Sequence, residues 1–170
     1  MPSIERKSEL TFTWDRGACA AEAARFASGV IGAQQSYISH GEIQTGLSTD
    51  GVTWIADLEG RFRADFAEPG DNREMLMVRD ATDTLVGIGI IAWEVDGPAR
   101  FGTIEDMAVD PAQRSGGIGR QILDRLVARI AEHGCDWAFL ESGRENHRAH
   151  AFFEAHEFRE MSHVFARRLR

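Results

Sequence analysis

Apolar residues recur along the chain with two different periods, which divide it into helical and extended segments. Alternation over residues 10–14 predicts a strand, and the alanine-rich stretch 18–30 favours a helix. A polar, glycine-containing segment, 32–51, follows. The next apolar group recurs at spacings of three and four and predicts a helix over 52–66: Trp54, Ile55, Leu58, Phe62 and Phe66.

The period then changes to that of a sheet. Residues 74–79, 84–93 and 101–109 are short apolar runs separated by turn-forming residues, which predicts three antiparallel strands in a meander. A second amphipathic helix follows and ends at Gly134. Its apolar stripe consists of Ile118, Ile122, Leu123, Leu126, Val127 and Ile130.

The last part of the chain predicts a parallel strand. A strand over 137–140 follows the amphipathic helix, and such a crossover should be right-handed and parallel. A helix over 147–156 and a last strand over 164–169 complete the pattern. We therefore expect one mixed α/β domain over residues 1–170, with a central, mostly antiparallel sheet, one parallel strand pair and helices on both faces.

Composition limits the classes of protein that fit. The 170 residues are 43% hydrophobic and 27% charged, as in an ordinary globular domain. No apolar run approaches the roughly 20 residues of a membrane span, and the first ten residues hold no apolar signal segment. We therefore expect a cytoplasmic protein without a membrane partner, in which Cys19 and Cys135 are free thiols.

The net charge of −8 argues against a nucleic-acid partner, because such proteins usually carry a basic stripe. The one basic cluster is the short run 167–170. An acidic surface attracts cationic partners such as amines, although acidity can also serve solubility alone.

The segment MAVDPAQRSGGIGRQIL, residues 107–123, has the features of an anion site. A strand ends, Pro111 interrupts pairing, glycines follow and a helix begins. The first N–H groups of a helix have no internal acceptor, and the helix dipole adds positive charge there. The amides of residues 115–119 are therefore expected to hold a phosphate, with Arg114 and Arg120 as further donors.

The spacing of the glycines selects among phosphate ligands. The Walker pattern is absent, and the dinucleotide pattern G-x-G-x-x-G fails after Gly119. The pattern [RQ]-x-x-G-x-[GA] matches from Arg114 to Gly119. With this motif the chain resembles the GNAT superfamily of N-acetyltransferases. In that superfamily the motif binds the pyrophosphate of acetyl-CoA. The segment LESGRENHRAHAFFEAHEF is also similar to a family pattern, so the resemblance covers about residues 74–169.

The resemblance implies where the cofactor lies. The pantetheine arm should take main-chain hydrogen bonds from Met107 and Val109, where the strands splay between Ala108 and the segment around Leu140. Asn146 matches a cofactor-contacting position, although asparagine is equally a favoured helix N-cap. The implied cofactor site consists of Met107, Ala108, Val109, Arg114, Ser115, Gly116, Gly117, Ile118, Gly119, Arg120 and Asn146.

Two family positions differ in this chain. The family tyrosine that often serves as acid is Phe153, and the family glycine before the final phenylalanine is Glu157. The only tyrosine is Tyr37. Three alternatives stay open: another group donates a proton to the leaving thiolate, the thiolate leaves unassisted, or catalysis is lost and only binding remains.

Glu105 is the candidate general base. On a regular strand it shares one face with Thr103, Met107 and Val109, one pleat from the thioester. Acidic residues on this strand serve as base in several family members. The alternative is that Glu105 or its neighbour Asp106 forms an ion pair or faces solvent.

The segment 36–44 forms the acceptor wall in related folds. It holds Tyr37, His40 and Glu42, which are candidates for substrate binding unless the segment is a solvated loop. His147 and His150 are three residues apart on a predicted helix but lack the partners of a zinc motif, so we expect no metal.

The resemblance implies acetyl transfer from acetyl-CoA to a primary amine, and the acidity favours a small-molecule acceptor. Two alternatives stay open: a non-catalytic acyl-CoA-binding module, suggested by Phe153, and an acetyltransferase of protein lysine side chains or N-termini. A homodimer is possible, because family members often pair through terminal strands.

Overall fold

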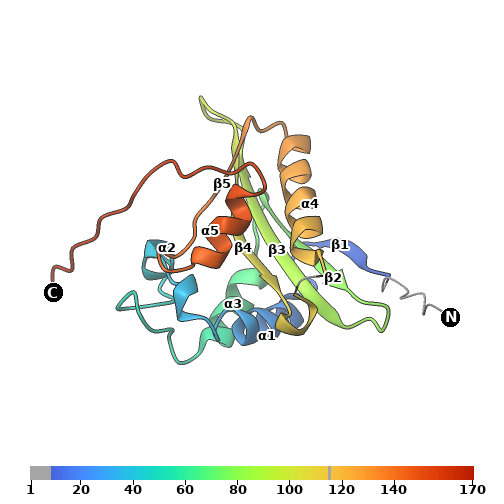
Figure 1. Ribbon diagram of the computed structural model, residues 1–170, viewed down its shortest axis with the longest axis horizontal. Helices are drawn as coiled ribbons and strands as arrows, with labels where there is room; N and C mark the ends of the chain where they lie inside the picture. The colour runs from blue at the N-terminus through green and yellow to red at the C-terminus, as the bar shows by residue number, and fades with distance from the viewer. Residues whose placement is uncertain (1–8, 115) are drawn as a thin grey trace.

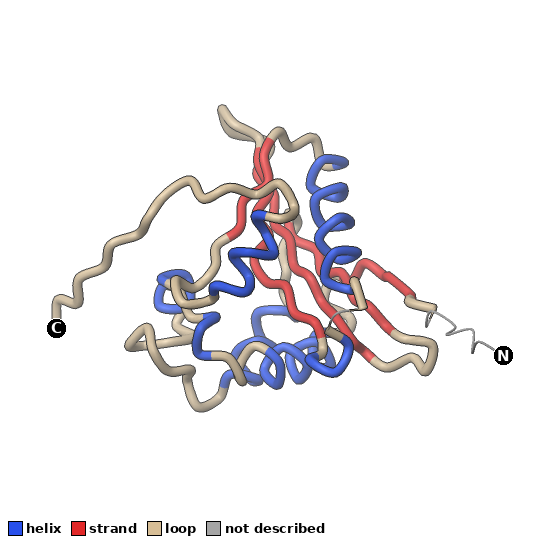
Figure 2. Tube along the Cα trace, viewed as in Figure 1, coloured by secondary structure: helices blue, strands red, loops and turns tan. Residues whose placement is uncertain are grey.

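One five-stranded sheet with helices on both faces forms the protein (Figures 1 and 2). The structure is a computed structural model that describes residues 9–114 and 116–170. Its strands are β1 (Thr11–Asp15), β2 (Arg73–Arg79), β3 (Leu85–Glu94), β4 (Phe101–Val109) and β5 (Trp137–Leu140). Its helices are α1 (Ala20–Val30), α2 (His40–Gln44), α3 (Leu58–Ala67), α4 (Ile118–Glu132) and α5 (His147–Glu154), with 3₁₀ turns η1 (Gln35–Tyr37) and η2 (Pro111–Gln113).

The strands lie in the order β1-β2-β3-β4-β5. Every neighbouring pair is antiparallel except β4 and β5, which are joined through α4 and run parallel. The expected mixed α/β fold with a mostly antiparallel sheet and one parallel pair is therefore confirmed. None of the helices in the described ranges is long and apolar enough to cross a lipid bilayer.

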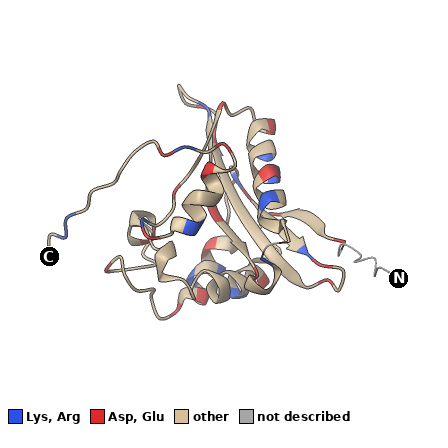
Figure 3. Ribbon diagram, viewed as in Figure 1, with Lys and Arg blue, Asp and Glu red and all other residues tan. Residues whose placement is uncertain are grey.

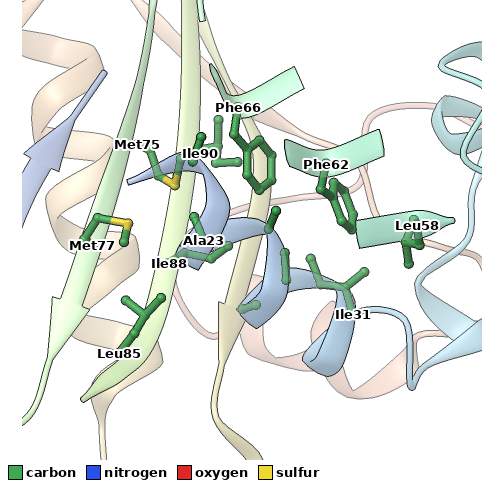
Figure 4. Close-up of a cluster of buried hydrophobic side chains, with 14 residues drawn as sticks. Ala23, Ile31, Leu58, Phe62, Phe66, Met75, Met77, Leu85, Ile88 and Ile90 are labelled. Carbon is green, nitrogen blue, oxygen red and sulfur yellow. The ribbon is translucent and has the colours of Figure 1, made fainter. Parts of the chain in front are cut away.

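Helices α1 and α3 cover one face of the sheet. The side of α1 that meets the sheet carries small residues, among them Ala23, Ala24 and Ala27, which are fully buried. Phe62 and Phe66 of α3 stack with ring centroids 5.3 Å apart and pack against the same cluster (Figure 4). Alanines let the two helices and the sheet approach closely, so the aromatic rings fill the remaining volume.

Helix α4 covers the opposite face through its predicted apolar stripe. Ile122, Leu123 and Leu126 are buried against the sheet, whereas Val127, assigned to the same stripe, lies at its edge and is partly exposed. The strands beneath α4 have glycines where they meet this helix. A Cβ atom on Gly89 of β3 would lie 2.7 Å from Leu126 Cδ1, so glycine lets α4 pack closely against the sheet.

Two predicted elements are wrong. The helix expected over 52–66 begins only at Leu58, because Asp50 Oδ1 accepts the amides of Val52 and Thr53 at 2.8 Å each. These side-chain bonds hold a turn in place of a helix, and Asp57 then caps α3.

The last strand expected over 164–169 is also absent. Residues 159–170, which the structure describes in full, are exposed and have no regular secondary structure. They leave the body of the protein as an extended arm (Figure 1). An extended segment becomes a strand only when a neighbouring strand takes its main-chain hydrogen bonds, and this arm has none in the described chain.

We expect Gly89→Ala to destabilise the protein by about 1–3 kcal/mol, because the added methyl meets Leu126 and Ile122 and pushes α4 off the sheet. Urea unfolding measures the change. Gly29→Ala is the matched control: Gly29 is an exposed residue of α1 with no atom near its missing Cβ, so alanine should add about 0.5–1 kcal/mol of stability. Equal effects at the two glycines would contradict the packing of α4.

Candidate active site

The site begins where β4 and β5 separate. The two strands pair from Phe101–Trp137 to Ile104–Leu140 and then diverge, as expected for the splay near Ala108. A cavity of about 510 Å³ occupies the gap. The amide of Asp110 donates to the Val86 carbonyl on β3 at 2.9 Å. Since peptide groups alternate along a strand, those of Met107 and Val109 are directed away from β3 and toward the gap.

The first turn of α4 closes one end of this cavity. Gly117 is its N-cap with φ +77°, and it makes no side-chain cap bond. The helical hydrogen bonds start with the amide of Gln121, which donates to the Gly117 carbonyl at 3.2 Å. The amides of residues 118–120 consequently have no acceptor within the helix. Glycine is favoured at position 117 by the left-handed backbone alone. Crowding is not the reason, since a Cβ there would meet no atom within 4 Å.

Most of the residues assigned to the cofactor line this cavity. They are Met107, Ala108, Val109, Arg114, Gly117, Ile118, Gly119, Arg120 and Asn146. Gly116 is not among the lining residues, and Ser115 lies outside the described residues. Asn146 also caps α5, since its Oδ1 accepts the Ala149 amide at 3.4 Å, so both interpretations of this asparagine agree with its position.

A β-bulge in β4 changes which side chains share a face. Ile90 of β3 is opposite Asp106, but the next residue, Ile91, is opposite Ile104, so Glu105 is the extra residue. The predicted face of Thr103, Glu105, Met107 and Val109 is therefore wrong. Beyond the bulge Met107 and Val109 join Ile104 in the cluster beneath α4, and Ala108 joins the cluster beneath α1.

The bulge brings Asp106 to Tyr37. The Tyr37 hydroxyl donates to Asp106 Oδ1 at 2.8 Å, and both residues line the cavity. Burial, reinforced by the negative charge of Glu105, raises the pKa of the Asp106 carboxyl to about 7, against the opposing effect of the Tyr37 hydrogen bond. Burial and the neighbouring Asp106 raise the pKa of Tyr37 well above its usual value, so the phenol stays protonated at neutral pH.

Glu105 has a different environment. Its Oε2 accepts from Arg73 Nε at 2.6 Å, and the same guanidinium binds Asp65 Oδ2 at 2.6 Å. Glu105 also lines the cavity. The neighbouring acids at positions 105 and 106 therefore differ: Glu105 is paired with an arginine, whereas Asp106 is partly buried and bonded to a tyrosine.

The acceptor segment, residues 36–44, is ordered by its own side chains. Ser39 Oγ accepts the Gly41 amide at 3.1 Å, and Glu42 accepts the Ser39 amide at 2.5 Å, which forms a capping box for α2. His40 Nε2 lies 3.1 Å from an oxygen of Glu141, just after β5. Tyr37 lines the cavity, whereas His40 and Glu42 are not among the residues that the structure shows around it.

Sequence reasoning missed three groups at the cavity: Asp106 as a partner of Tyr37, and the consecutive Glu141 and Ser142. The hydroxyl of Ser142 is buried and has no hydrogen-bond partner within the described ranges. The position of Glu141 and Ser142 directly after an apolar parallel strand is a usable sequence signal, because functional groups gather at such strand ends. The bulge that turns Asp106 inward leaves no comparable signal.

Helix α5 forms another wall of the cavity. Phe153, at the family's tyrosine position, lines the cavity with its ring and offers no polar group. Glu157 has φ +70°, a left-handed conformation that glycine adopts without strain, which accounts for glycine at this position of the family pattern. Among the described residues, no three His, Cys, Asp or Glu side chains gather as a metal site.

Comparison with known proteins identifies the family. The model of the acetyltransferase (GNAT) family matches residues 44–158. An aminoglycoside N-acetyltransferase solved in complex with CoA shares 14% identity and a TM-score of 0.72, over 98% of this chain and 99% of that chain. A ribosomal-protein-alanine N-acetyltransferase from Brucella melitensis biovar Abortus 2308 shares 15% identity and a TM-score of 0.67, over 95% and 100%.

At these identities the structural similarity shows a common fold. No curated protein sequence matches the chain. The family model, however, spans more than half of the chain, including β4, the glycine-rich turn and α5. The chain therefore belongs to the acetyltransferase (GNAT) family.

Proposed function

We propose that the protein transfers the acetyl group of acetyl-CoA directly to a primary amine of a small molecule. One observation carries this proposal: the Asp106–Tyr37 pair and the unpaired amides at the start of α4 line the same cavity. A site for a diphosphate and a group that can accept a proton therefore lie in one cavity. This is the arrangement that a thioester cofactor and an amine acceptor require.

The cofactor half of the proposal uses backbone groups and arginines. The amides of residues 118–120 would hold the diphosphate, with Arg114 and Arg120 as additional cations. The peptide groups of Met107 and Val109 would bind the pantetheine arm as an added strand. Ser115, Gly116 and Asn146 remain proposed contacts on the basis of the family motif.

Asp106 is the proposed general base. An alkylammonium has a pKa near 10.4, so only about one molecule in a thousand is free amine at neutral pH. Asp106 would take the ammonium proton, after which the amine nitrogen attacks the thioester carbon. The carbon–sulfur bond then breaks, and the further proton that the nitrogen loses passes to the departing CoA thiolate, which leaves as the free thiol. A carboxyl whose pKa is about 7 suits this role, because it is substantially deprotonated at neutral pH and still basic. Glu105, paired with Arg73, is the alternative base.

Two hydroxyls are proposed to replace the family tyrosine that is Phe153 here. Tyr37 carries a proton at neutral pH beside Asp106, and Ser142, whose buried hydroxyl has no partner in the described structure, also lines the cavity. Ser142 can donate a hydrogen bond to the departing thiolate, and Tyr37 can do so once Asp106 has taken the amine proton and no longer needs its hydrogen bond. A thiolate whose acid has a pKa near 8.5 needs only modest assistance.

The charge of the cavity supports a cationic small-molecule acceptor. Glu105, Asp106 and Glu141 line the cavity that also holds the proposed diphosphate site. His40 and Glu42 lie outside this lining and are proposed to set its charge through Glu141 and Tyr37. An aminoglycoside enzyme is among the similar folds, and so is an enzyme of ribosomal-protein alanine, which keeps a protein acceptor as the alternative.

The function is tested by incubating the protein with acetyl-CoA and an amine panel while measuring free thiol. The panel holds polyamines, amino sugars, aminoglycosides, amino acids, and peptides with an N-terminal alanine or an internal lysine. We expect thiol release with one or more small cationic amines. Release with peptides alone would identify a protein acetyltransferase, and tight acetyl-CoA binding without release from any amine would identify a binding module.

We expect Gly117→Asp to weaken acetyl-CoA binding at least 100-fold in calorimetry, because it places a carboxylate and a strained backbone beside the diphosphate. Gly70→Asp is the matched control. Gly70 has nearly the same φ, +76°, and equally open surroundings, but it is not a cavity residue. Undiminished affinity of the Gly117 variant would show that the diphosphate does not bind at this turn.

We expect kcat/KM to rise with pH through an inflection near 7, because Asp106 accepts a proton only after losing its own. Asp106→Asn should lower kcat about 100-fold or more and abolish this inflection. Glu105→Gln is the matched control and should retain the inflection. Loss of the inflection in Glu105→Gln, with Asp106→Asn unaffected, would assign the base to Glu105.

Asp106 should also reduce stability at neutral pH. Its folded-state pKa, about 7, exceeds the unfolded value of about 3.9, so the folded state binds the proton more tightly. The free energy of unfolding therefore falls as pH rises from about 4 through 7. We expect Asp106→Asn to be more stable than the natural protein in urea at pH 8, with little difference at pH 4. A less stable variant at pH 8 would contradict the burial of this carboxyl.

A further inference from the structure

Strands β4 and β5 carry a row of aromatic side chains just outside the cavity. Trp137 is 52% exposed and Phe139 41% exposed, and their rings are nearly parallel with centroids 5.9 Å apart. The ring of Phe101 meets that of Phe139 edge to face, with centroids 5.8 Å apart. These three residues form what we call the aromatic platform. A contiguous exposed apolar surface of this kind often marks a binding site.

The platform residues of β5 face away from α4. Ala138 and Leu140 belong to the cluster beneath that helix. Side chains alternate along a strand, so Trp137 and Phe139 are directed to the other face, the one that α1 and α3 cover elsewhere. Glu141 continues this alternation, and its carboxylate accepts a main-chain amide of α2 at 3.1 Å.

Phe101 and Asp106 lie on the same face of β4. A Cβ atom on Gly102 would lie 2.5 Å from a side chain of α4, so the neighbouring Phe101 is directed away from that helix. The bulge at Glu105 returns Asp106 to the face of Phe101, where it bonds to Tyr37. The aromatic platform and the proposed general base therefore share one face of the sheet.

The platform begins where the cavity ends. The cavity lining on the two strands starts at Ile104 and Leu140, which are opposite each other in the parallel pair. The pair before them joins Thr103 to Phe139. A molecule bound in the cavity can therefore extend along the strands onto the platform without crossing another element of the sheet.

The charge changes at this boundary. Residues 101–104 and 137–140 include no charged side chain (Figure 3). The cavity side holds three acids: Glu105, Asp106 and Glu141. Arg73 pairs with the first of them only. A ligand that complements both parts has a cationic group at one end and an apolar, planar group at the other.

Strand geometry sets the length of such a ligand. Alternate residues on one face of a strand are about 6.6 Å apart, so Phe139 lies about this far before Glu141, and Trp137 about twice as far. Aromatic rings pair at centroid distances of about 4.5–7 Å. A ring joined to an ammonium group by a short alkyl chain can therefore contact Phe139 while the ammonium stays among the acids.

We propose that the aromatic platform is a binding site for the distal part of the acceptor, and that the acceptor is an arylalkylamine. Its ammonium group would lie beside Asp106 and Glu141, and its ring would pack against Phe139 and Trp137. This assignment rests on the acetyl transfer proposed above and narrows the class of amine that it uses.

Thiol release with phenethylamine and with ethylamine, which lacks only the phenyl ring, tests the assignment. We expect kcat/KM to be about ten-fold or more higher for phenethylamine. Phe139→Ala and Trp137→Ala should each lower it about ten-fold for phenethylamine and less than about two-fold for ethylamine. Val127→Ala is the matched control: it shortens a partly exposed apolar side chain on α4, across the sheet, and should change neither value.

Calorimetry of phenethylamine with the CoA-loaded protein separates binding from transfer. We expect Phe139→Ala to weaken binding about ten-fold, whereas Phe139→Tyr, which keeps the ring, should bind as the natural protein does. Both variants should keep the urea unfolding midpoint, because Phe139 is outside the two buried core clusters.

The two measurements distinguish a failure of the platform from a failure of the reaction. Thiol release with other amines, but no preference for phenethylamine over ethylamine, would overturn the platform and leave the acetyl transfer intact. Phenethylamine binding that depends on Phe139, without thiol release from any amine, would support the platform and contradict the transfer. If spermidine depends on Phe139 as strongly as phenethylamine does, the rings bind a second cation and the arylalkylamine assignment is wrong.

Discussion

The limited pairing of β4 with β5 is the constraint on which the site depends. The strands are bonded as far as Ile104 and Leu140, and beyond this point no strand of the described residues pairs with β4 on this side. The peptide groups of β4 are then available to a ligand, and the loop after β5 can carry Glu141 and Ser142 to the cavity. If the pairing continued, the same residues would form an ordinary sheet without a cavity.

Two further features set the chemistry of this gap. Close contact between Gly89 and Leu126 fixes α4 on the sheet, so its unpaired first amides open into the cavity. The bulge at Glu105 reverses the alternation of β4 and directs Asp106 to Tyr37 instead of toward α4. One feature thus determines where an anion can bind, and the other determines which carboxyl is buried beside it.

Much of the fold was predictable because burial imposes a period on the sequence. The stripe of α4 and the strands β2, β3 and β4 were predicted within a residue or so of their bounds. The failures occurred where local side-chain bonds or missing partners override the period, as at Asp50 before α3 and in the arm around Phe165. The glycine-rich turn was visible in the sequence because its backbone requires glycine, whereas the role of Asp106 depends on a bulge that alternation alone does not reveal.

The central claim is that the unpaired amides of α4 and the buried carboxyl of Asp106 serve one bound acetyl-CoA molecule. A crystal structure of the complex with acetyl-CoA tests this most directly. The account predicts diphosphate oxygens about 3 Å from the amides of residues 118–120, and the thioester in the gap beside Asp106 and Tyr37. A diphosphate bound elsewhere, or a thioester on the far side of β4 from Asp106, would contradict it.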